Sequence, residues 1–231
     1  MNTKPLENPI ILRAAKLDKT FRHPSNVQIL KNLSLTVHRG ETIAIMGRSG
    51  EGKSTLLQIL GTLETPCSGS LEIDGKLVSR FNKSLIRNQK LGFIFQSFHL
   101  LEDYTAIENV LIPARIARKK TSPGEKAYQR ASDLLEHVGL NDRLHFNTKL
   151  LSGGEKQRVA IARALCNDPE IILADEPSGN LDKQTSQSIH KLLLDLSQIQ
   201  GKTLIVVTHD PILAEMCSTC YTLVNGRLEQ K

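Results

Sequence analysis

The stretch TIAIMGRSGEGKSTLLQILG, residues 42–61, joins an aliphatic run to a glycine-rich turn and then to a helical segment. Gly47, Gly52, Lys53 and Ser54 stand in the spacing Gly-x4-Gly-Lys-Ser, which is typical of a phosphate-binding loop. Glycines let backbone N–H groups surround a phosphate where a Cβ would obstruct them. The pattern predicts that Lys53 reaches the β- and γ-phosphates of a nucleotide and that Ser54 ligates Mg²⁺ at the start of the helix.

The whole turn is expected to lie against the phosphates. Its predicted nucleotide-binding residues are Gly47, Arg48, Ser49, Gly50, Glu51, Gly52, Lys53, Ser54 and Thr55. Glu51 adds a negative charge beside phosphates, so its side chain is expected to point outward. The alternative, a chance glycine turn, fits poorly with a strand before it and a helix after it.

Outside this stretch the chain alternates β-like and helical runs, which is typical of an α/β fold. The aliphatic runs at 42–46, 171–175 and 204–208 suit strands covered by helices on both faces, as in a parallel sheet. Further strand candidates are IILRAAKL (10–17), LSLTVH (33–38), SLEID (70–74), GFIFQ (92–96) and YTLVN (221–225). Short turn signals, Asp74-Gly75 and Asn225-Gly226 among them, separate several of these runs.

The character of the chain changes between Gln96 and Leu151. The runs 104–120 and 124–140 have helical spacing, with Ser-Pro-Gly between them. Residues 97–163 are therefore predicted to form a helical subdomain inserted into an α/β core. A later helix is expected over 184–199, because Ile189, Leu192, Leu193 and Leu196 recur at core-facing intervals.

Polar residues end three of the predicted strands. Asp175 and Glu176 follow IILA, and acids at the end of a parallel strand face a phosphate loop, so Asp175 is expected to hold Mg²⁺ and Glu176 to polarise the attacking water. His209 follows LIVVT as a candidate γ-phosphate contact, with a structural histidine as the alternative. Gln96 is a candidate ligand for Mg²⁺ or water, with a strand cap as the alternative.

A second glycine-containing helix start occurs in LSGGEKQRVAIARAL, residues 151–165. The first N–H groups of a helix lack partners and carry partial positive charge, so this construction also suits an anion. One chain thus contains two phosphate-seeking helix starts, about a hundred residues apart in sequence.

These motifs, in this order, resemble the ATP-binding cassette (ABC) ATPases over nearly the whole chain, and LSGGEKQRVAIARAL is the most specific of them. The resemblance implies a P-loop NTPase (RecA-like) α/β core with a small antiparallel β subdomain and an inserted helical subdomain. We expect a single ABC ATPase domain over 1–231, with 1–96 and 164–231 as the catalytic core and 97–163 as the helical subdomain.

The resemblance also implies roles for individual residues. Gln96 falls at the Q-loop, Asp175 and Glu176 at the Walker B pair, 178–182 at the D-loop, and His209 at the switch histidine. Phe21 falls where the family places an aromatic that stacks on adenine, although tyrosine is commoner there. The implied catalytic residues are Glu176, His209 and Gln96, and the implied Mg²⁺ ligands are Ser54, Gln96 and Asp175.

In this family two cassettes pair head to tail, and each SGG turn covers ATP held by the phosphate loop of the other chain. The resemblance therefore implies that Ser152, Gly153, Gly154 and Asp182 serve a nucleotide shared with a second copy of the chain. It further implies integral membrane permease subunits, docked near the Q-loop. In the segment after Gln96, the apolar residues Phe98, Leu100, Leu101 and Tyr104 fit either such docking or the core of the helical subdomain.

The composition gives 30 basic against 24 acidic residues, a net charge of +6. The densest basic cluster is ARIARKK, with Arg115, Arg118, Lys119 and Lys120, and it fits either a solvated helix end or a lipid-facing patch. No aromatic residues interleave these charges, so nucleic acid is not expected as a partner. No apolar run approaches the ~18–20 residues that cross a bilayer, and the first residues lack the features of a secretory signal.

The four cysteines are expected to be reduced and structural, because Cys217 and Cys220 have no second pair to complete a zinc site.

Within the family, LGFIFQSFHLLEDYTAIENVLIPARI and ADEPSGNLD resemble a bacterial branch serving lipoprotein release, macrolide export and cell division. The similarity is greatest to the lipoprotein-releasing cassettes. An ATPase at the cytoplasmic face of the inner membrane, peripherally attached, is expected. A soluble cassette acting on DNA or ribosomes is disfavoured, because the segment between Gln96 and Ser152 leaves no room for a long coiled-coil insertion.

Overall fold

A six-stranded sheet forms the centre of the computed structural model, which describes residues 8–22 and 26–230. Its strand order is β10-β9-β3-β8-β7-β6, and only β10 runs antiparallel to its neighbour. The strands are β3 (Thr42–Met46), β6 (Leu91–Ile94), β7 (Ile171–Asp175), β8 (Thr203–Val207), β9 (Thr219–Val224) and β10 (Arg227–Gln230). All five residues of β8 are buried, as expected for an aliphatic strand covered on both faces.

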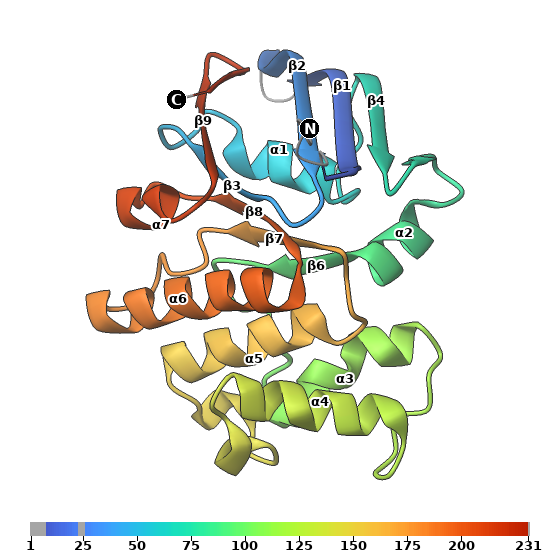
Figure 1. The fold of residues 1–231 in the computed structure, drawn as a ribbon, viewed down its shortest axis with the longest axis vertical. Helices are drawn as coiled ribbons and strands as arrows, with labels where there is room; N and C mark the ends of the chain where they lie inside the picture. The colour runs from blue at the N-terminus through green and yellow to red at the C-terminus, as the bar shows by residue number, and fades with distance from the viewer. Residues whose placement is uncertain (1–7, 23–25, 231) are drawn as a thin grey trace, which may run out of the picture.

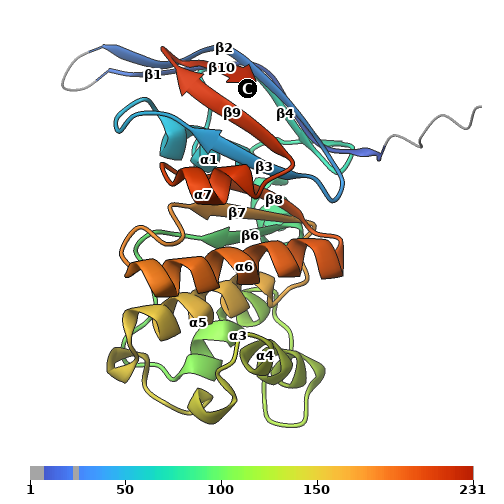
Figure 2. The ribbon, with the colours of Figure 1, turned by 60° about the vertical axis from the view of Figure 1, so that its left-hand side comes forward.

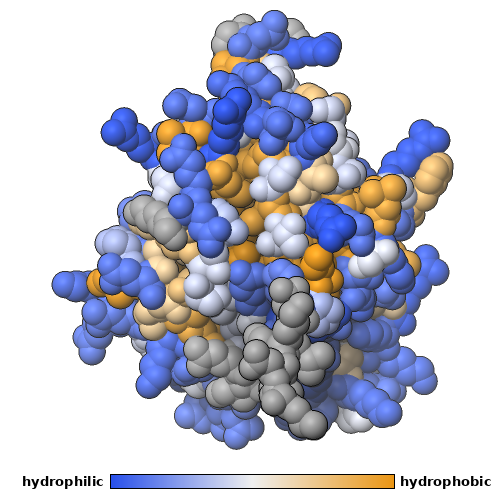
Figure 3. All heavy atoms as spheres, turned by 45° about the horizontal axis from the view of Figure 1, so that its top comes forward, coloured by the Kyte–Doolittle hydropathy of each residue, from blue (hydrophilic) through white to orange (hydrophobic). Residues whose placement is uncertain are grey.

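A second, antiparallel sheet lies beside the first, at the top of Figure 1. It has the order β2-β1-β4-β5, with β1 (Ile10–Phe21), β2 (Val27–His38), β4 (Ser68–Ile73) and β5 (Lys76–Leu77). Asp74 and Gly75 join β4 to β5 with φ of 50° and 70°, the positive values that a tight hairpin turn requires. Figure 3 views the molecule obliquely from this side, where hydrophobic residues gather near the middle and hydrophilic residues surround them.

Seven α-helices are present in the described residues. They are α1 (Lys53–Leu60), α2 (Lys83–Lys90), α3 (Ala106–Ile116), α4 (Lys126–His137), α5 (Gly153–Leu165), α6 (Lys183–Gln200) and α7 (Pro211–Glu215). Two 3₁₀ turns, η1 (Asn141–Arg143) and η2 (Thr148–Leu150), connect α4 to α5. Figures 1 and 2 show α3, α4 and α5 stacked below the parallel sheet, at the opposite end of the molecule from the antiparallel sheet.

The parallel sheet separates two hydrophobic cores, because alternate strand residues face opposite sides. Ile43 and Ile45 of β3 belong to the core that also contains α1 and the antiparallel sheet. Ala44 belongs to the core that contains α3, α4, α5 and α6. The helices α1 and α5, whose starts carry the two glycine motifs, therefore pack on opposite faces of the sheet.

This architecture confirms the predicted α/β class with an antiparallel subdomain and inserted helices. The strand predicted over 92–96 ends at Ile94, so Gln96 lies in the loop beyond it. The helix predicted over 104–120 covers only Ala106–Ile116. Four elements were not predicted from the sequence: β5, β10, α2 and α7. The two strands and α7 are short, and α2 buries only Ile86. Among the described residues, no helix has the length and apolar character needed to span a bilayer.

Candidate active site

The phosphate loop ends in a helix start that no side chain caps. The N-cap of α1 is Gly52, with φ of 95°, and it makes no side-chain hydrogen bond to the helix. A Cβ at Gly52 would lie 2.1 Å from Cγ2 of Ile29, and one at Gly47 would lie 2.8 Å from the Leu223 carbonyl oxygen. Both positions therefore require glycine, and the first N–H groups of α1 remain free to bind an anion.

The side chain of Lys53 is held over the phosphate loop by carbonyl groups of the loop backbone. Its side chain is buried, and Nζ donates to the carbonyl oxygens of Gly47 at 2.9 Å and Arg48 at 3.1 Å. These contacts fix the ammonium group at the mouth of the turn, where a phosphate would meet it.

A cavity of about 570 Å³ opens at this loop. Nine of the predicted site residues line it, and the sequence analysis missed Ile29, the tenth. The lining residues are Ile29, Ser49, Gly50, Gly52, Lys53, Ser54, Thr55, Gln96, Glu176 and His209. The structure thus brings together the loop and the ends of three strands, although these segments lie far apart in the sequence.

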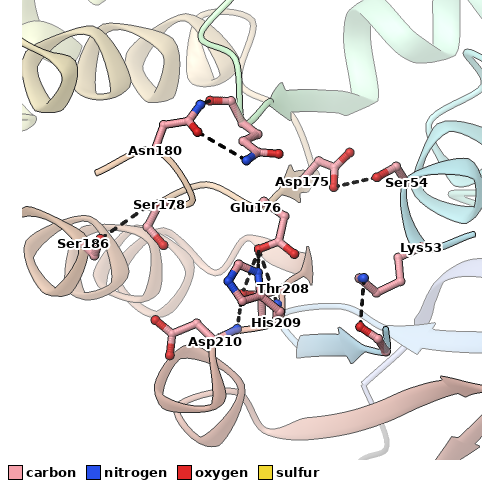
Figure 4. Close-up of polar contacts among 12 residues, drawn as sticks. Lys53, Ser54, Asp175, Glu176, Ser178, Asn180, Ser186, Thr208, His209 and Asp210 are labelled. Atoms are coloured by element: carbon pink, nitrogen blue, oxygen red, sulfur yellow. Dashed lines mark hydrogen bonds and ion pairs between the residues drawn. The ribbon is translucent and has the colours of Figure 1, made fainter. Parts of the chain in front are cut away.

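Ser54 and Asp175 meet beside this cavity (Figure 4). The Ser54 hydroxyl donates to Asp175 Oδ1 at 3.1 Å. Burial raises the pKa of Asp175 and the neighbouring Glu176 carboxylate adds to the rise, while the Ser54 hydrogen bond opposes it. A bound cation would reverse this shift by stabilising the carboxylate.

This oxygen pair fits Mg²⁺, which prefers hydroxyl and carboxylate oxygens and usually keeps ligands from water and phosphate. In the described part of the chain, no group of three or more His, Cys, Asp or Glu side chains is placed to hold a metal. The Ser54 and Asp175 oxygens would leave the other positions of an octahedral Mg²⁺ to water and phosphate.

Glu176 and His209 point toward one another in Figure 4. Nδ1 of His209 lies 2.8 Å from Glu176 Oε2, and this oxygen also accepts from the Thr208 hydroxyl at 3.4 Å. Glu176 has φ of 45°, a left-handed conformation that is unfavourable for a residue with a side chain. Such backbone strain is concentrated at functional sites, where surrounding contacts maintain it.

The loop after β7 makes two further contacts that the sequence analysis missed. Asn180 donates through Nδ2 to the Gln96 carbonyl oxygen at 3.1 Å, and Gln96 Nε2 donates to Asn180 Oδ1 at 3.4 Å. His190 of α6 is buried, and its Nε2 lies 2.7 Å from the Ser178 hydroxyl. A histidine within the apolar stripe of the predicted helix was the signal that could have revealed this contact.

The second glycine motif lies outside the cavity. Ser152 is the N-cap of α5 and forms a capping box with Glu155: the Ser152 hydroxyl accepts from the Glu155 N–H, and Glu155 accepts from the Ser152 N–H at 2.8 Å. Gly153 and Gly154 form the first turn of α5. Asp182 caps α6 by accepting from the N–H groups of Gln184 and Thr185. None of these predicted nucleotide contacts lines the cavity of the same chain.

Three remaining site residues stand around the loop. Arg48 is exposed beside it. Phe21 is 39% exposed, and Lys19 Nζ lies 5.0 Å from its ring centroid, but Phe21 does not line the cavity. The expectation that Glu51 points outward is wrong: its Oε2 is buried without a hydrogen-bond partner among the described residues, close to Gly47.

The phosphate loop, the carboxylate pair and the second glycine motif define an ATP-binding cassette, and a family model described as ABC transporter matches residues 30–179. The chain belongs to the ABC transporter family, as its sequence predicted. It is 62% identical to the lipoprotein-releasing system ATP-binding protein LolD of Protochlamydia amoebophila, over 96% of this chain and 97% of that protein. It is 44% identical to LolD of Bacteroides thetaiotaomicron, over 93% of this chain and 99% of that protein.

Solved structures of cassettes share this fold. A dimeric structure of the bacterial ABC transporter cassette MJ0796 matches with a TM-score of 0.86 and 39% identity, covering 95% of this chain and 97% of that one. A dimeric post-hydrolysis state of the same cassette, bound to ADP and Pi, matches with a TM-score of 0.87 and 37% identity, covering 96% and 98%. The chain is thus an ATP-hydrolysing cassette in fold and family.

Proposed function

We propose that the chain is the ATP-hydrolysing subunit of a membrane complex that releases lipoproteins from the inner membrane for delivery to the outer membrane. The observation that carries this proposal is the 62% identity to LolD over nearly the full length of both chains. The subunit acts as a peripheral protein at the cytoplasmic face of the inner membrane. Cassettes for macrolide export or cell-division control are the alternatives, and the identity of the membrane partner separates them.

Two copies of the chain form two composite sites, head to tail. The cavity of one chain holds the phosphate loop but not Ser152, Gly153 or Gly154, so each α5 start is free to meet a nucleotide on another chain. The dimeric structures of MJ0796 support this arrangement. Closure of the dimer on two ATP molecules and its opening after hydrolysis then drive the membrane partner.

Within each site the residues divide the work. Lys53 and the N–H groups of α1 bind the triphosphate, and Phe21 stacks on the adenine. Ser54, Asp175 and Gln96 would hold Mg²⁺, which, when bound, neutralises phosphate charge. Glu176 orients the attacking water and accepts its proton, a role that typically contributes ~10²–10⁴ in rate.

His209 holds the Glu176 carboxylate in the present conformation, at 2.8 Å. For Glu176 to accept a proton from water, its oxygen must be available to that water. We therefore infer that nucleotide binding draws His209 toward the γ-phosphate and frees Glu176 from the pair. The exposed ring of His209 has room for this movement.

The membrane partner docks at a groove of about 570 Å³ between α2 and α3. Arg87 and Asn88 line its α2 side, and Ile112 and Ile116 line its α3 side. The segment after Gln96 divides its apolar residues: Leu101 is 48% exposed, whereas Leu100 packs against the hydrophobic core. Leu101 and Tyr104 do not line the groove but are exposed, and we propose that they also contact the membrane partner. The groove is lined both by residues of the proposed catalytic core (1–96 and 164–231) and by residues of the proposed helical subdomain (97–163), which fits that division of the chain.

Reconstitution with the membrane subunits tests this function. Wild-type chain purified with its membrane partner should release a lipoprotein from proteoliposomes only when ATP is hydrolysed. Leu101→Asp should abolish co-purification with that partner while ATP binding to the isolated chain survives. Loss of ATP binding in this variant would show that Leu101 is structural, and transport of a different cargo would favour an alternative function.

A further inference from the structure

An exposed apolar and basic ridge runs from β5 into α2, and it reaches the docking groove at Ser84. Leu77, Phe81 and Leu85 are 62%, 83% and 59% exposed, unusually high values for large apolar side chains in one short segment. Lys76, just before Leu77, and Arg80, just before Phe81, are also exposed, and the guanidinium of Arg80 lies 4.6 Å from the centroid of the Phe81 ring. Residues 76–85 are called the α2 ridge below.

A similar ridge borders the groove on its α3 side. Ile116, which lines the groove, is 68% exposed, and Arg118, Lys119 and Lys120 follow it on the surface. Residues 116–120 are called the α3 ridge. They contain most of the basic cluster for which the sequence left open a solvated helix end or a lipid-facing patch.

The two ridges lie on the same side of the molecule (Figure 1), where α2 and the end of α3 form opposite walls of one groove. Hydrogen bonds hold these walls together, because Asn88 of α2 donates to the Pro113 carbonyl oxygen at 3.2 Å. Lys119 also donates to Asn167 at 3.0 Å, and Asn167 donates to Pro113. These hydrogen bonds hold the ends of α2 and α3 next to one another, and Lys119 of the α3 ridge takes part in them.

The rim, residues 76–85 and 116–120, is basic because it contains lysines and arginines but no acidic residue. The sequence contains no Asp or Glu in residues 75–101 or in residues 109–124. Among the residues that the structure describes, none of the ridge lysines and arginines forms an ion pair. Two acids near the α2 ridge in sequence form ion pairs with other residues: Glu64 pairs with Lys19, and Asp74 pairs with Arg39 and Lys90. The charge of Lys83 also contributes to the lowered pKa of Glu64.

We propose that the α2 and α3 ridges rest on the anionic phospholipid surface of the membrane, on both sides of the docked membrane subunit. The proposal rests on the proposed function, because the docking groove sets which side of the chain faces the membrane. Aromatic and leucine side chains among lysines and arginines are the combination that binds an interface of acidic head groups. The ridges thus orient the cassette and hold it at the membrane while the groove engages its partner.

Flotation of the purified chain with vesicles, without membrane subunits or nucleotide, tests this contact. Phosphatidylcholine vesicles containing phosphatidylglycerol should bind the chain, and vesicles of phosphatidylcholine alone should not. Arg80→Glu/Lys83→Glu should weaken binding by at least about tenfold, since each cation near an anionic surface contributes strongly. Phe81→Ser/Leu85→Ser should weaken binding and leave the remainder more sensitive to salt.

Matched variants separate the ridges from the overall positive charge. Lys149→Glu/Lys191→Glu makes the same charge change on η2 and α6, and Leu150→Ser removes an apolar side chain that is 72% exposed elsewhere. Both should bind vesicles like wild type. Equal losses in these controls, or unchanged binding in the ridge variants, would overturn the proposal. So would ridge variants that lose only the membrane subunit, because a protein partner would then cover the rim.

The outcomes also separate this proposal from the proposed function. None of the substituted residues lines the nucleotide cavity, so the two ridge variants and the two control variants should all keep wild-type ATP binding. If anionic vesicles bind as expected but the reconstituted complex releases no lipoprotein, only the function fails. If release is normal and ridge variants bind vesicles like wild type, only the lipid contact fails.

Discussion

The two glycine-containing helix starts, at α1 and α5, differ in how their first N–H groups are capped. The α1 start has a left-handed glycine as its N-cap, no side-chain cap and no acid in its first turn. The α5 start is closed by its own side chains, since Ser152 and Glu155 form a capping box. An uncapped helix start keeps its full attraction for an anion, whereas a carboxylate in the first turn already satisfies part of it.

This difference indicates that the starts do unequal work. The α1 start can hold a triphosphate within one chain. The α5 start offers the N–H groups of Gly153 and Gly154 but carries the Glu155 charge, so it is suited to complete a site that another chain has already filled. We expect α1 variants to change nucleotide affinity and α5 variants to change dimer formation.

The largest effect is expected on ATP turnover, from a substitution of Glu176. In the proposed mechanism this residue acts only after the α1 and α5 starts have both bound the nucleotide. Glu176→Gln removes the proposed proton acceptor and should lower ATP turnover by about 10²–10⁴-fold. The variant should still bind ATP and accumulate as a closed dimer. Phosphate release measures its turnover, and size-exclusion chromatography measures the dimer. Unchanged turnover would refute the role of Glu176, and a triphosphate enclosed by one chain in crystals of this variant would remove the basis of the comparison.

Lys53→Ala tests the α1 side. The substitution removes the ammonium group that we propose contacts the phosphates, so affinity for ATP should fall by about 10–100-fold, as expected for charge-assisted hydrogen bonds. Titration of the isolated chain with a fluorescent ATP analogue measures this loss. Normal affinity would mean that the backbone N–H groups alone bind the triphosphate.

Ser152→Ala tests the α5 side, ideally in the Glu176→Gln background where dimers accumulate. The isolated chain should keep its ATP affinity, while ATP-driven dimerisation should weaken by about tenfold, the value of one lost hydrogen bond to a charged group. Ultracentrifugation at several protein concentrations measures the dimer.

Thr105→Ala is the matched control, because Thr105 forms the same capping box with Glu108 at the start of α3. Both substitutions should reduce stability by roughly 0.5–2 kcal/mol, the usual contribution of an N-cap. Only Ser152→Ala should affect the dimer. An equal loss of dimer in both variants would attribute the effect to stability instead of nucleotide contact.

The comparison also shows what the sequence could and could not predict. The phosphate loop and the aliphatic strands are local patterns, and Ser54 and Asp175 meet as predicted because the parallel strands end at one edge beside the loop. The Ser152-x-x-Glu155 capping box was readable as a spacing but was not recognised. The pairs Glu176–His209 and Gln96–Asn180 join distant segments whose side-chain directions depend on packing, which no local pattern encodes.

A smaller effect is expected from pH at the α5 start. The Ser152 N–H donates to the Glu155 carboxylate and lowers the pKa of Glu155, with the Ser152 hydroxyl and Arg143 contributing. A carboxylate whose folded pKa is depressed stabilises the fold above its unfolded pKa and loses that contribution as pH falls. Wild type should therefore exceed Glu155→Gln in stability at neutral pH, and the gap should narrow as pH falls below the usual pKa of a glutamate and then through the lowered pKa of Glu155. Denaturant unfolding at several pH values measures it, and a constant gap would contradict the assigned cap.

The smallest effect is expected at Glu51, the acidic residue closest in sequence to the start of α1. The first turn of α1 itself contains no acid. Glu51 lies in the loop just before that turn, with one carboxylate oxygen buried beside Gly47 and without a hydrogen-bond partner among the described residues. Its charge opposes the triphosphate, so Glu51→Ala should tighten ATP binding by a few-fold, as one like charge at partly screened distance predicts. Glu51→Gln is the control for the lost side-chain volume and should tighten binding similarly. Weaker binding in both variants would instead mean that Glu51 orders the loop, and the α1 start would then depend on its own acid just as α5 does.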